Sequence, residues 1–318
     1  MSTRVPDTKL TSTFTPTIHS RPSSSLDPSK NTLPTPLTVC IVGASRGIGA
    51  GIATSYARAL APGSTLFIVA RESSASHLST VQKTAQELNP SITVTRLFAD
   101  ITSAQSVAEL ATSIQQQQQH NSLDVVVLNS GWAGPEVVLK MTEGNPEDFQ
   151  NVFDINAIGT YHVVHYLVPL LLASENADVR QLLVVSSFAS ILTNGPIANT
   201  AYCVSKMAQV RLVEFASEQF GKEENGGLTC AAVHPGAVLT ESADDTCPDV
   251  FRPYLTDDVE LCGAFCVWMS REKRAWLNGR LLSAKWDVDE LTAKKDIIEQ
   301  QDLLKLGLRI GDISIPAI

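Results

Sequence analysis

The sequence predicts an α/β fold in which helices cover both faces of a parallel sheet of about seven strands. From residue 37 onward, short apolar runs alternate with helix-length segments, which is the pattern of a doubly wound sheet with helical crossovers. Most of the apolar runs are nearly continuous, as expected for strands buried on both faces. A chain of 318 residues with 44% hydrophobic content can fill one large core.

The expected elements divide the chain into three parts. Strands are expected at residues 37–42, 65–70, 92–97, 124–128, 181–186, 228–233 and 280–283. Helices are expected after Gly47, Ser73, Ser103, Pro146, Thr200 and Thr256, and a last one at 288–304. Residues 37–285 then form one domain and 286–318 a helical tail. Residues 1–36 are rich in Ser, Thr and Pro without a hydrophobic period, which predicts a flexible or surface-wrapping arm.

Charge and composition narrow the classes of partner. The formal net charge is -9 and no basic stretch is concentrated, which argues against nucleic acid or an anionic membrane and favours a small-molecule substrate. The longest apolar run, 161–173, is too short to span a bilayer. The six cysteines lack a disulfide-framework spacing, and no apolar N-terminal stretch resembles a secretion signal, so we expect a cytoplasmic protein.

Two residue pairs have a spacing that metal ligands on a helix can use. They are His162 with His165 and Cys262 with Cys266. Neither pair has companion ligands, and both lie in apolar helical segments. We therefore expect core or interface residues and no metal site.

A glycine-rich turn joins the first expected strand to the first expected helix. Gly43, Gly47 and Gly49 follow an apolar run and precede an alanine-rich helix. Glycine lets the backbone turn sharply and approach a pyrophosphate, and the helix N-terminus favours negative charge. The alternative is a tight strand-to-helix turn without a ligand. The spacing G-x-x-x-G-x-G differs from the commonest dinucleotide fingerprint, G-x-G-x-x-G.

The end of the second expected strand bears on which dinucleotide would bind. An NAD site places an acidic residue there to bind the ribose diol, and this sequence has Ala70. Arg71 follows at once and Arg46 lies in the glycine turn, so two guanidinium groups could hold a 2'-phosphate. We therefore predict NADP(H). The alternative is that either arginine is a solvated surface charge.

Tyr202 and Lys206 lie four positions apart in an expected helix, so both side chains are on one face. Hydride transfer to a carbonyl builds negative charge on oxygen and needs a proton donor. A free tyrosine has a pKa of about 10, and a nearby ammonium group would lower that pKa. Ser187 ends a buried strand upstream, where its hydroxyl could bond the substrate oxygen; Ser190 is the alternative.

As a set, these features resemble the short-chain dehydrogenases/reductases, a family with a Rossmann-type fold. The glycine spacing, the Ser-Tyr-Lys order and the later segments LNSG, FDINAIG and VHPGAVLTE agree with that family over about 200 residues, Gly43 to Thr240. The departures are Val42, Ser130 and Trp132, and a loop between Ser187 and Tyr202 two residues longer than usual.

The resemblance implies roles for further residues. It places Asp100 and Ile101 near the adenine ring, Asn129 and Gly131 behind the adenosine ribose, and Pro235 and Gly236 in a turn under the nicotinamide, with Val238 and Thr240 on its carboxamide. Asn156 would support a proton relay through Lys206 to Tyr202. The expected cofactor-binding residues are then Gly43, Ser45, Arg46, Gly47, Ile48, Gly49, Arg71, Asp100, Ile101, Asn129, Gly131, Tyr202, Lys206, Pro235, Gly236, Val238 and Thr240.

The same resemblance extends to assembly and to substrate. The family associates through the helices carrying Asn156 and Tyr202, which implies a homodimer or homotetramer. Residues 241–255 stand where the family has a substrate-covering lid, so Cys247, Phe251 and Tyr254 are expected to help define the pocket. The segments at 15–30 and 278–310 are similar to a fungal subgroup, many of whose members act in secondary metabolism.

The sequence therefore predicts an NADP(H)-dependent oxidoreductase, a ketoreductase or alcohol dehydrogenase acting on a small organic molecule. In this hypothesis Tyr202 is the acid and base, Ser187 orients the oxygen, Lys206 tunes Tyr202 and Asn156 supports the relay. Two alternatives stay open. One is an NADP(H)-binding enzyme of the same fold that catalyses a non-redox step such as cyclisation or dehydration, and the other is a non-catalytic dinucleotide-binding protein.

Overall fold

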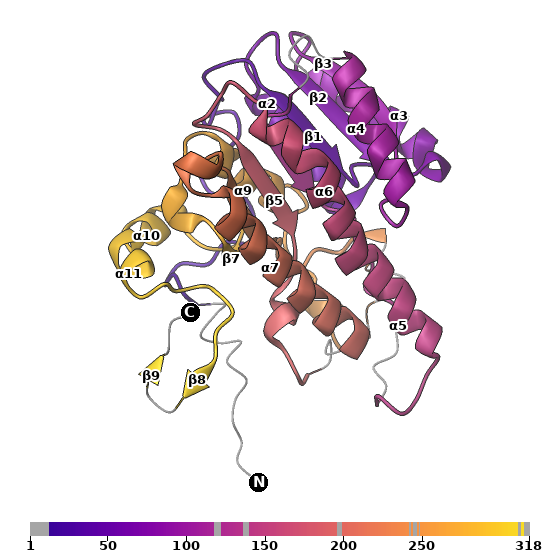
Figure 1. The fold of residues 1–318 in the computed structure, drawn as a ribbon, viewed down its shortest axis with the longest axis vertical. Coiled ribbons are helices and arrows are strands. Elements are labelled where there is room, and N and C mark those ends of the chain that lie inside the picture. The colour runs from indigo at the N-terminus through magenta and orange to yellow at the C-terminus, as the bar shows by residue number, and fades with distance from the viewer. Residues whose placement is uncertain are drawn as a thin grey trace.

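The structure, a computed structural model, describes residues 13–117, 122–135, 140–195, 199–241, 243, 247, 249–310 and 313–314. Its centre is a parallel sheet with the strand order β3-β2-β1-β4-β5-β6-β7 (Figure 1). The seven strands are β1 (Thr38–Val42), β2 (Thr65–Ala70), β3 (Thr93–Phe98), β4 (Val125–Leu128), β5 (Gln181–Val185), β6 (Thr229–His234) and β7 (Arg280–Ser283). The expected strands and the doubly wound fold class are confirmed.

Helices cover both faces of the sheet, and β1 illustrates how its side chains serve each face. Val39 and Ile41 join the core under α2 (Gly47–Ala59), α3 (Ala75–Leu88) and α9 (Leu261–Ser270). Cys40 and Val42 join the core under α4 (Ala104–Gln117), α6 (Gly159–Leu172) and α7 (Thr200–Phe220). Successive side chains of a strand point to opposite faces, so a continuous apolar run supplies two cores at once.

The strand order places a crevice at one edge of the sheet. β1 pairs with β2 on one side and with β4 on the other, all parallel. The chain therefore winds outward from β1 to β3 and then returns to begin β4 next to β1. Ligands of such sheets bind outside the carboxyl ends of the strands at this point of reversal.

One long helical segment crosses the face of the sheet that α4, α6 and α7 cover. It runs through α5 (Pro146–Phe153), a π-helical turn η2 (Asp154–Ile158) and α6. By length and apolar composition this segment, Pro146–Leu172, is the one helix among the described residues that meets the requirements of a membrane span, and half of its most apolar window is buried in the domain. That burial is the pattern of a core helix packed on a sheet.

The described part of the N-terminal arm lies against the C-terminal segment. Ile18 forms an antiparallel bridge with Trp286, just beyond β7. Leu26 and Leu33 are 0% and 2% exposed and belong to the core under α2. Residues 1–12 of the expected arm lie outside the described residues.

The tail differs from the single helix expected at 288–304. It forms two short helices, α10 (Val288–Thr292) and α11 (Lys295–Gln300). Helical structure ends there because Asp302 and Leu304 take left-handed φ angles of 46° and 68°, and the Leu304 carbonyl accepts the Leu281 N–H of β7 at 2.8 Å. An unexpected two-stranded ladder, β8 (Arg309–Ile310) with β9 (Ile313–Ser314), follows.

Candidate active site

A cavity of about 820 Å³ opens at the carboxyl edge of the sheet, where the strand order reverses. Residues that follow β1, β2, β4, β5 and β6 line its walls. Sixteen of the seventeen residues expected to bind the cofactor line this cavity, and the exception is Gly49. Ser187 lines it as well. Segments far apart in the chain thus meet at one site.

The glycine turn has no room for side chains. A Cβ at Gly49 would lie 1.9 Å from the Gly43 carbonyl oxygen, and one at Gly43 would lie 2.6 Å from the Ser130 nitrogen. Gly43 and Gly47 also have φ angles of 90° and 54°. The Asn129 amide donates to the Gly43 carbonyl at 2.9 Å, which holds the turn to the end of β4.

The turn leaves the N-terminus of α2 ready to receive an anion. No acidic residue occupies the first turn of α2, and no side chain caps its amides. The first N–H groups of a helix and its dipole favour negative charge. A cradle that excludes side chains and presents these amides fits the pyrophosphate of a dinucleotide.

The two arginines expected to choose the dinucleotide both line the cavity. Arg71 follows β2 directly, next to Ala70. Arg46 precedes α2, and its guanidinium lies 3.3 Å from the Glu241 carboxylate, with both side chains at least half exposed. This solvated pair is weak, so Arg46 can exchange Glu241 for a phosphate.

Asp100, expected at the adenine end, belongs to the same wall. Its carboxylate accepts the N–H and hydroxyl of Thr102 at 2.9 and 2.8 Å. Beside it, the Ile101 carbonyl lies 2.8 Å from Nδ1 of His162. His162 is thus a partly buried, hydrogen-bonded helix residue, and no cluster of potential metal ligands occurs among the described residues.

Tyr202 and Ser187 both line the cavity, and their side chains are hydrogen-bonded to each other. Burial raises the pKa of Tyr202 to about 12, and a hydrogen bond with the Ser187 side chain opposes that rise. Asn199 caps α7 by accepting the Tyr202 N–H at 3.3 Å, which places the tyrosine in the first turn. Ser190, the alternative serine, is buried away from the cavity wall.

Lys206 lies one turn further along α7 and is 4% exposed. Its Nζ donates to the Val185 carbonyl at 3.0 Å and to Gln209 Oε1 at 2.9 Å, and it lies 5.7 Å from the centre of the Tyr202 ring. Burial lowers the pKa of Lys206 to about 7. The sequence predicted that this lysine would lower the pKa of Tyr202. The structure contradicts that prediction, because the amine is directed at other acceptors and its own charged form is disfavoured.

Asn156 occupies the π-helical turn and is fully buried. Its side chain accepts the Trp132 N–H and donates to the Trp132 carbonyl, both at 2.8 Å, and it donates to Ser205 Oγ at 3.0 Å. A Cβ at Gly131 would lie 3.2 Å from Asn156 Oδ1 and 3.3 Å from Lys206 Nζ. Gly131 therefore lets the asparagine, the lysine and the end of β4 meet.

The expected lid contributes part of the wall. Glu241, Ala243, Cys247, Phe251 and Leu255 line the cavity. Tyr254 is not among the lining residues, contrary to the prediction: it is 65% exposed, and its ring packs against Phe251 with centroids 5.6 Å apart. The short helix at 252–254 turns Phe251 inward and Tyr254 outward. Residues 242, 244–246 and 248 lie outside the described residues.

Sequence reasoning missed two groups: one residue of the cavity wall, and an ion pair that contacts the wall through Ala237. His234 lines the cavity, stacks on Phe188 with centroids 4.4 Å apart, and has its pKa lowered to about 3 by burial and by Lys285. Its position directly before Pro235 was the available signal. The second group, Asp257 with Lys285, joins residues 28 positions apart, and no local pattern indicates that contact.

A glycine cradle at the reversal point of a doubly wound sheet, faced by a phenol and a hydroxyl, is the architecture of a dinucleotide-binding oxidoreductase domain. The family model for short chain dehydrogenases matches residues 37–250. The chain accordingly belongs to the short-chain dehydrogenase family, whose members are oxidoreductases that bind a nicotinamide dinucleotide.

Individual relatives agree with this assignment. The chain is 35% identical over 304 residues to the short chain dehydrogenase pgmD of Aspergillus terreus, covering 93% of this chain and 94% of that protein. It is 35% identical over 271 residues to mpl6 of Monascus purpureus, covering 85% and 88%. Among solved structures, the oxidoreductase yciK of E. coli has the same fold, with a TM-score of 0.66 at 22% identity over 80% of this chain and 97% of that one.

The lowered pKa of Lys206 predicts a pH-dependent stability. An unfolded lysine has a pKa near 10.5, against about 7 in the fold. Between these values the unfolded chain binds more protons, so stability rises with pH. Relative to Lys206→Met, we expect the free energy of unfolding of the wild type to increase by about 1 kcal/mol per pH unit between about pH 7 and about pH 9.

Urea unfolding of both proteins across that range measures the difference. Lys222→Met, a change at an exposed lysine, is the matched control and should follow the wild type at every pH. Parallel pH profiles for the wild type and Lys206→Met would contradict the prediction.

Proposed function

We propose that the protein is an NADP(H)-dependent oxidoreductase that interconverts a ketone and an alcohol on a small organic molecule. The observation that carries this proposal is the pairing of Tyr202 with Ser187 on the wall of the cavity that also holds the glycine cradle. Two hydroxyl groups converge where a carbonyl oxygen can receive both, opposite the place where a dinucleotide fits.

The bound nicotinamide would supply or accept the hydride. Ser187 and Tyr202 would donate hydrogen bonds to the substrate oxygen, where negative charge develops during reduction. A pKa of about 12 keeps the Tyr202 phenol protonated at neutral pH, so the tyrosine holds the proton that the developing alkoxide needs. Tyr202 would thus be the acid in reduction, and in the reverse reaction its phenolate would be the base.

Lys206 is suited to return a proton to that tyrosine. Its pKa of about 7 lets the amine gain and lose a proton near neutral pH. From Lys206 a hydrogen-bond chain runs through Gln209 to Thr160, at 2.9 Å per step, and from Thr160 to the Asn156 carbonyl at 2.7 Å. Asn156 would hold the end of this chain in the π-helical turn.

The preference for NADP(H) rests on charge at the end of β2. Arg71 and Arg46 line the wall, and Ala70 stands where an NAD site would place an acid. A guanidinium group binds phosphate through paired, charge-assisted hydrogen bonds. The 2'-phosphate is the part of NADP(H) that would use them.

The proposed class of substrate follows from the apolar part of the cavity wall. This part is formed by Trp132, Ile155, Phe251 and Leu255, and the polar residue Asn151 also lines the cavity. Such a wall suits a ring system that carries few polar groups. We propose that the substrate is a polyketide-like or related secondary metabolite. We also propose that the protein acts in the cytoplasm, where buried thiols such as Cys40, Cys230 and Cys262 stay reduced.

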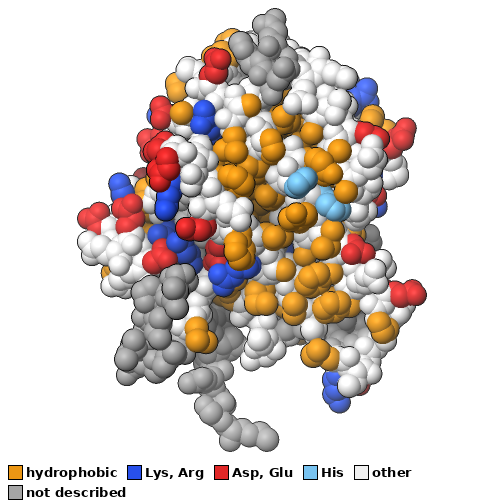
Figure 2. All heavy atoms as spheres, viewed as in Figure 1, with side chains coloured by type: hydrophobic (Ala, Val, Ile, Leu, Met, Phe, Trp, Pro, Cys, Tyr) orange, Lys and Arg blue, Asp and Glu red, His pale blue; other side chains and the backbone are white. Residues whose placement is uncertain are grey.

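We also propose that two copies associate through α6 and α7. Hydrophobic side chains gather over these helices, and most charged side chains lie at the margin of the area (Figure 2). Five exposed hydrophobic residues belong to this area. They are Phe149 of α5, Ile158 of η2, Tyr161 of α6, and Met207 and Phe215 of α7. Large exposed apolar patches on soluble proteins are typical of protein interfaces, and the helices beneath carry Asn156 and Tyr202.

Replacing the proposed acid tests the mechanism. Tyr202→Phe removes the proton donor and one hydrogen bond to the developing oxyanion, so we expect turnover to fall by about a hundredfold to a thousandfold. NADPH consumption with a panel of cyclic and aromatic ketones measures this. Tyr161→Phe is the matched control, and NADPH binding should survive both changes. Nearly wild-type turnover in Tyr202→Phe would contradict the role, and product formed without NADPH consumption would favour a non-redox step.

The dinucleotide preference has its own test. Arg71→Ala with Arg46→Ala should raise the KM for NADPH by about ten- to a hundredfold, because hydrogen bonds to charged groups contribute about 1.5–3 kcal/mol. The KM for NADH should change little. Arg96→Ala, at an exposed arginine of β3, should leave both values unchanged. Equal use of NADH and NADPH by the wild type would overturn the assignment.

The assembly proposal is tested by placing charge within the apolar area. Tyr161→Asp with Phe215→Asp should convert the wild-type dimer or tetramer to a monomer, because a buried unpaired carboxylate is costly. Light scattering after size-exclusion chromatography measures the mass. Leu88→Asp, at a 40% exposed leucine of α3, is the control. A monomeric wild type at micromolar concentration would refute the interface.

A further inference from the structure

The turn after β6 forms part of the cavity wall, and a single carboxylate holds it. Pro235, Gly236 and Ala237 line the cavity. The Ala237 N–H donates to Asp257 Oδ2 at 2.6 Å, and the Asp257 N–H donates to the Ala237 carbonyl at 2.9 Å. These reciprocal bonds fasten the turn to residue 257, just beyond the lid segment 241–255.

The carboxylate also explains the glycine in that turn. Gly236 has a φ of 99°, and a Cβ there would lie 2.8 Å from Asp257 Oδ2. The turn therefore lies directly on the Asp257 side chain. A change at residue 257 would alter the height and the angle of this part of the wall.

Asp257 is held in turn by a partly buried ion pair with Lys285. Its side chain is 0% exposed, and Lys285 Nζ lies 2.5 and 2.6 Å from its two oxygens. Lys285 follows β7, so the pair joins the end of the last strand of the sheet to the wall of the cavity. Buried carboxylates are stable when such partners satisfy them.

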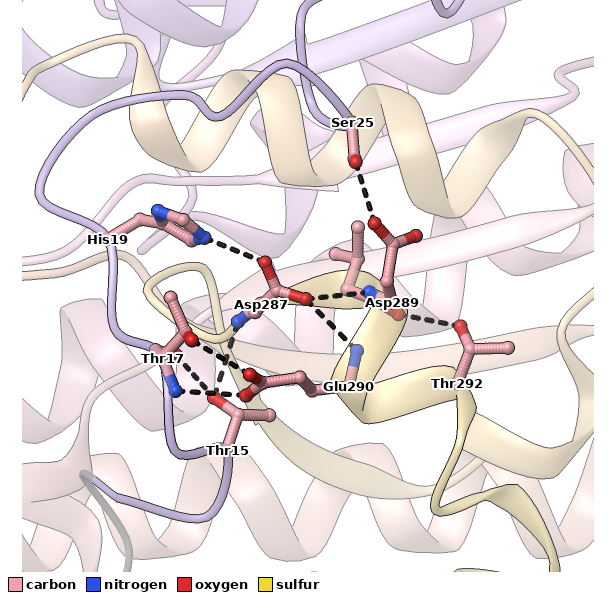
Figure 3. Close-up of polar contacts among 9 residues, drawn as sticks. Thr15, Thr17, His19, Ser25, Asp287, Asp289, Glu290 and Thr292 are labelled. Carbon is pink, nitrogen blue, oxygen red and sulfur yellow. Dashed lines mark hydrogen bonds and ion pairs between the residues drawn. The ribbon is translucent and has the colours of Figure 1, made fainter.

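The N-terminal arm bonds the backbone of Lys285 and of Asp258, the residue after Asp257. The His19 N–H donates to the Lys285 carbonyl at 2.8 Å, and the Asp258 N–H donates to the Ser20 carbonyl at 2.7 Å. Figure 3 shows the same stretch of arm anchored on the C-terminal segment. There Thr17 bonds Glu290 at 2.9 and 2.7 Å, and His19 Nε2 lies 2.9 Å from Asp287.

From these contacts we infer that Asp257 is a positioning residue for the dinucleotide. Asp257 fixes the position of the Pro235–Ala237 turn in the cavity wall, where the nicotinamide would bind. Lys285 and the arm hold Asp257 in place. The inference rests on the proposed function only in assuming that a dinucleotide occupies the cavity. It gives the described part of the arm a role in the geometry of the site.

Substitutions at residue 257 test this role. Asp257→Leu removes both acceptor oxygens, and Asp257→Asn keeps one for the Ala237 N–H but loses the charge that faces Lys285. We expect the Kd for NADPH, measured by fluorescence titration, to rise about tenfold or more in Asp257→Leu, and Asp257→Asn to recover most of that loss. The KM for NADPH should rise in parallel, with a smaller change in the KM for a ketone.

Thermal unfolding separates positioning from general stability. Asp258→Asn changes the neighbouring exposed carboxylate, which accepts the Glu260 N–H at 2.8 Å; it should leave the Kd unchanged even if Tm falls. If Asp257→Leu fails to fold, Thr17→Val with His19→Ala loosens the arm without touching the wall and should raise the Kd about threefold.

An unchanged Kd in folded Asp257→Leu, or in the arm variant if Asp257→Leu does not fold, would overturn the inference. Absence of ketone turnover in the wild type would count against the proposed function alone, because the NADPH titration does not depend on it.

Discussion

The contact between Gly49 and the Gly43 carbonyl is the constraint on which the site depends. Because no side chain fits between them, α2 begins directly above the end of β1, and its first amides face the cavity. The same closeness continues along α2, where a Cβ at Gly51 would lie 2.3 Å from the Val259 carbonyl and one at Gly263 would lie 2.5 Å from Ser55 Oγ. The segment between the lid and α9 is thereby drawn against the helix that forms the cradle.

Burial acts in opposite directions on the two titrating residues of α7. It raises the pKa of the Tyr202 phenol and lowers that of the Lys206 ammonium, because each loses solvation of its charged form. At neutral pH the tyrosine therefore holds its proton, while the lysine is close to its own midpoint. A proton donor next to a group that exchanges protons easily is the combination that acid-base chemistry on a carbonyl requires.

The ends of the chain take part in the same architecture. Phe14 packs on Trp286 with ring centroids 5.1 Å apart, and Trp286 lies 6.0 Å from Phe188, the neighbour of Ser187. Together with the Asp257–Lys285 pair, this aromatic series joins the arm and the C-terminal segment to two sides of the cavity. The described parts of the N-terminal arm and of the C-terminal segment therefore support the geometry of the site.

The sequence alone determined the sheet, the glycine cradle and the Tyr202–Lys206 spacing, because each depends on local features: continuous apolar runs, glycine at close approaches and helical spacing. It left Ser187 and Ser190 as alternatives, because both lie within one short segment. Tertiary structure decided which serine lines the cavity, that Tyr254 points outward, and that Lys206 is directed at Val185 and Gln209. It also decided the pairing of Asp257 with Lys285 and the docking of the arm on the C-terminal segment. These outcomes depend on desolvation and on contacts between residues distant in the chain, and both exist only once the chain has folded.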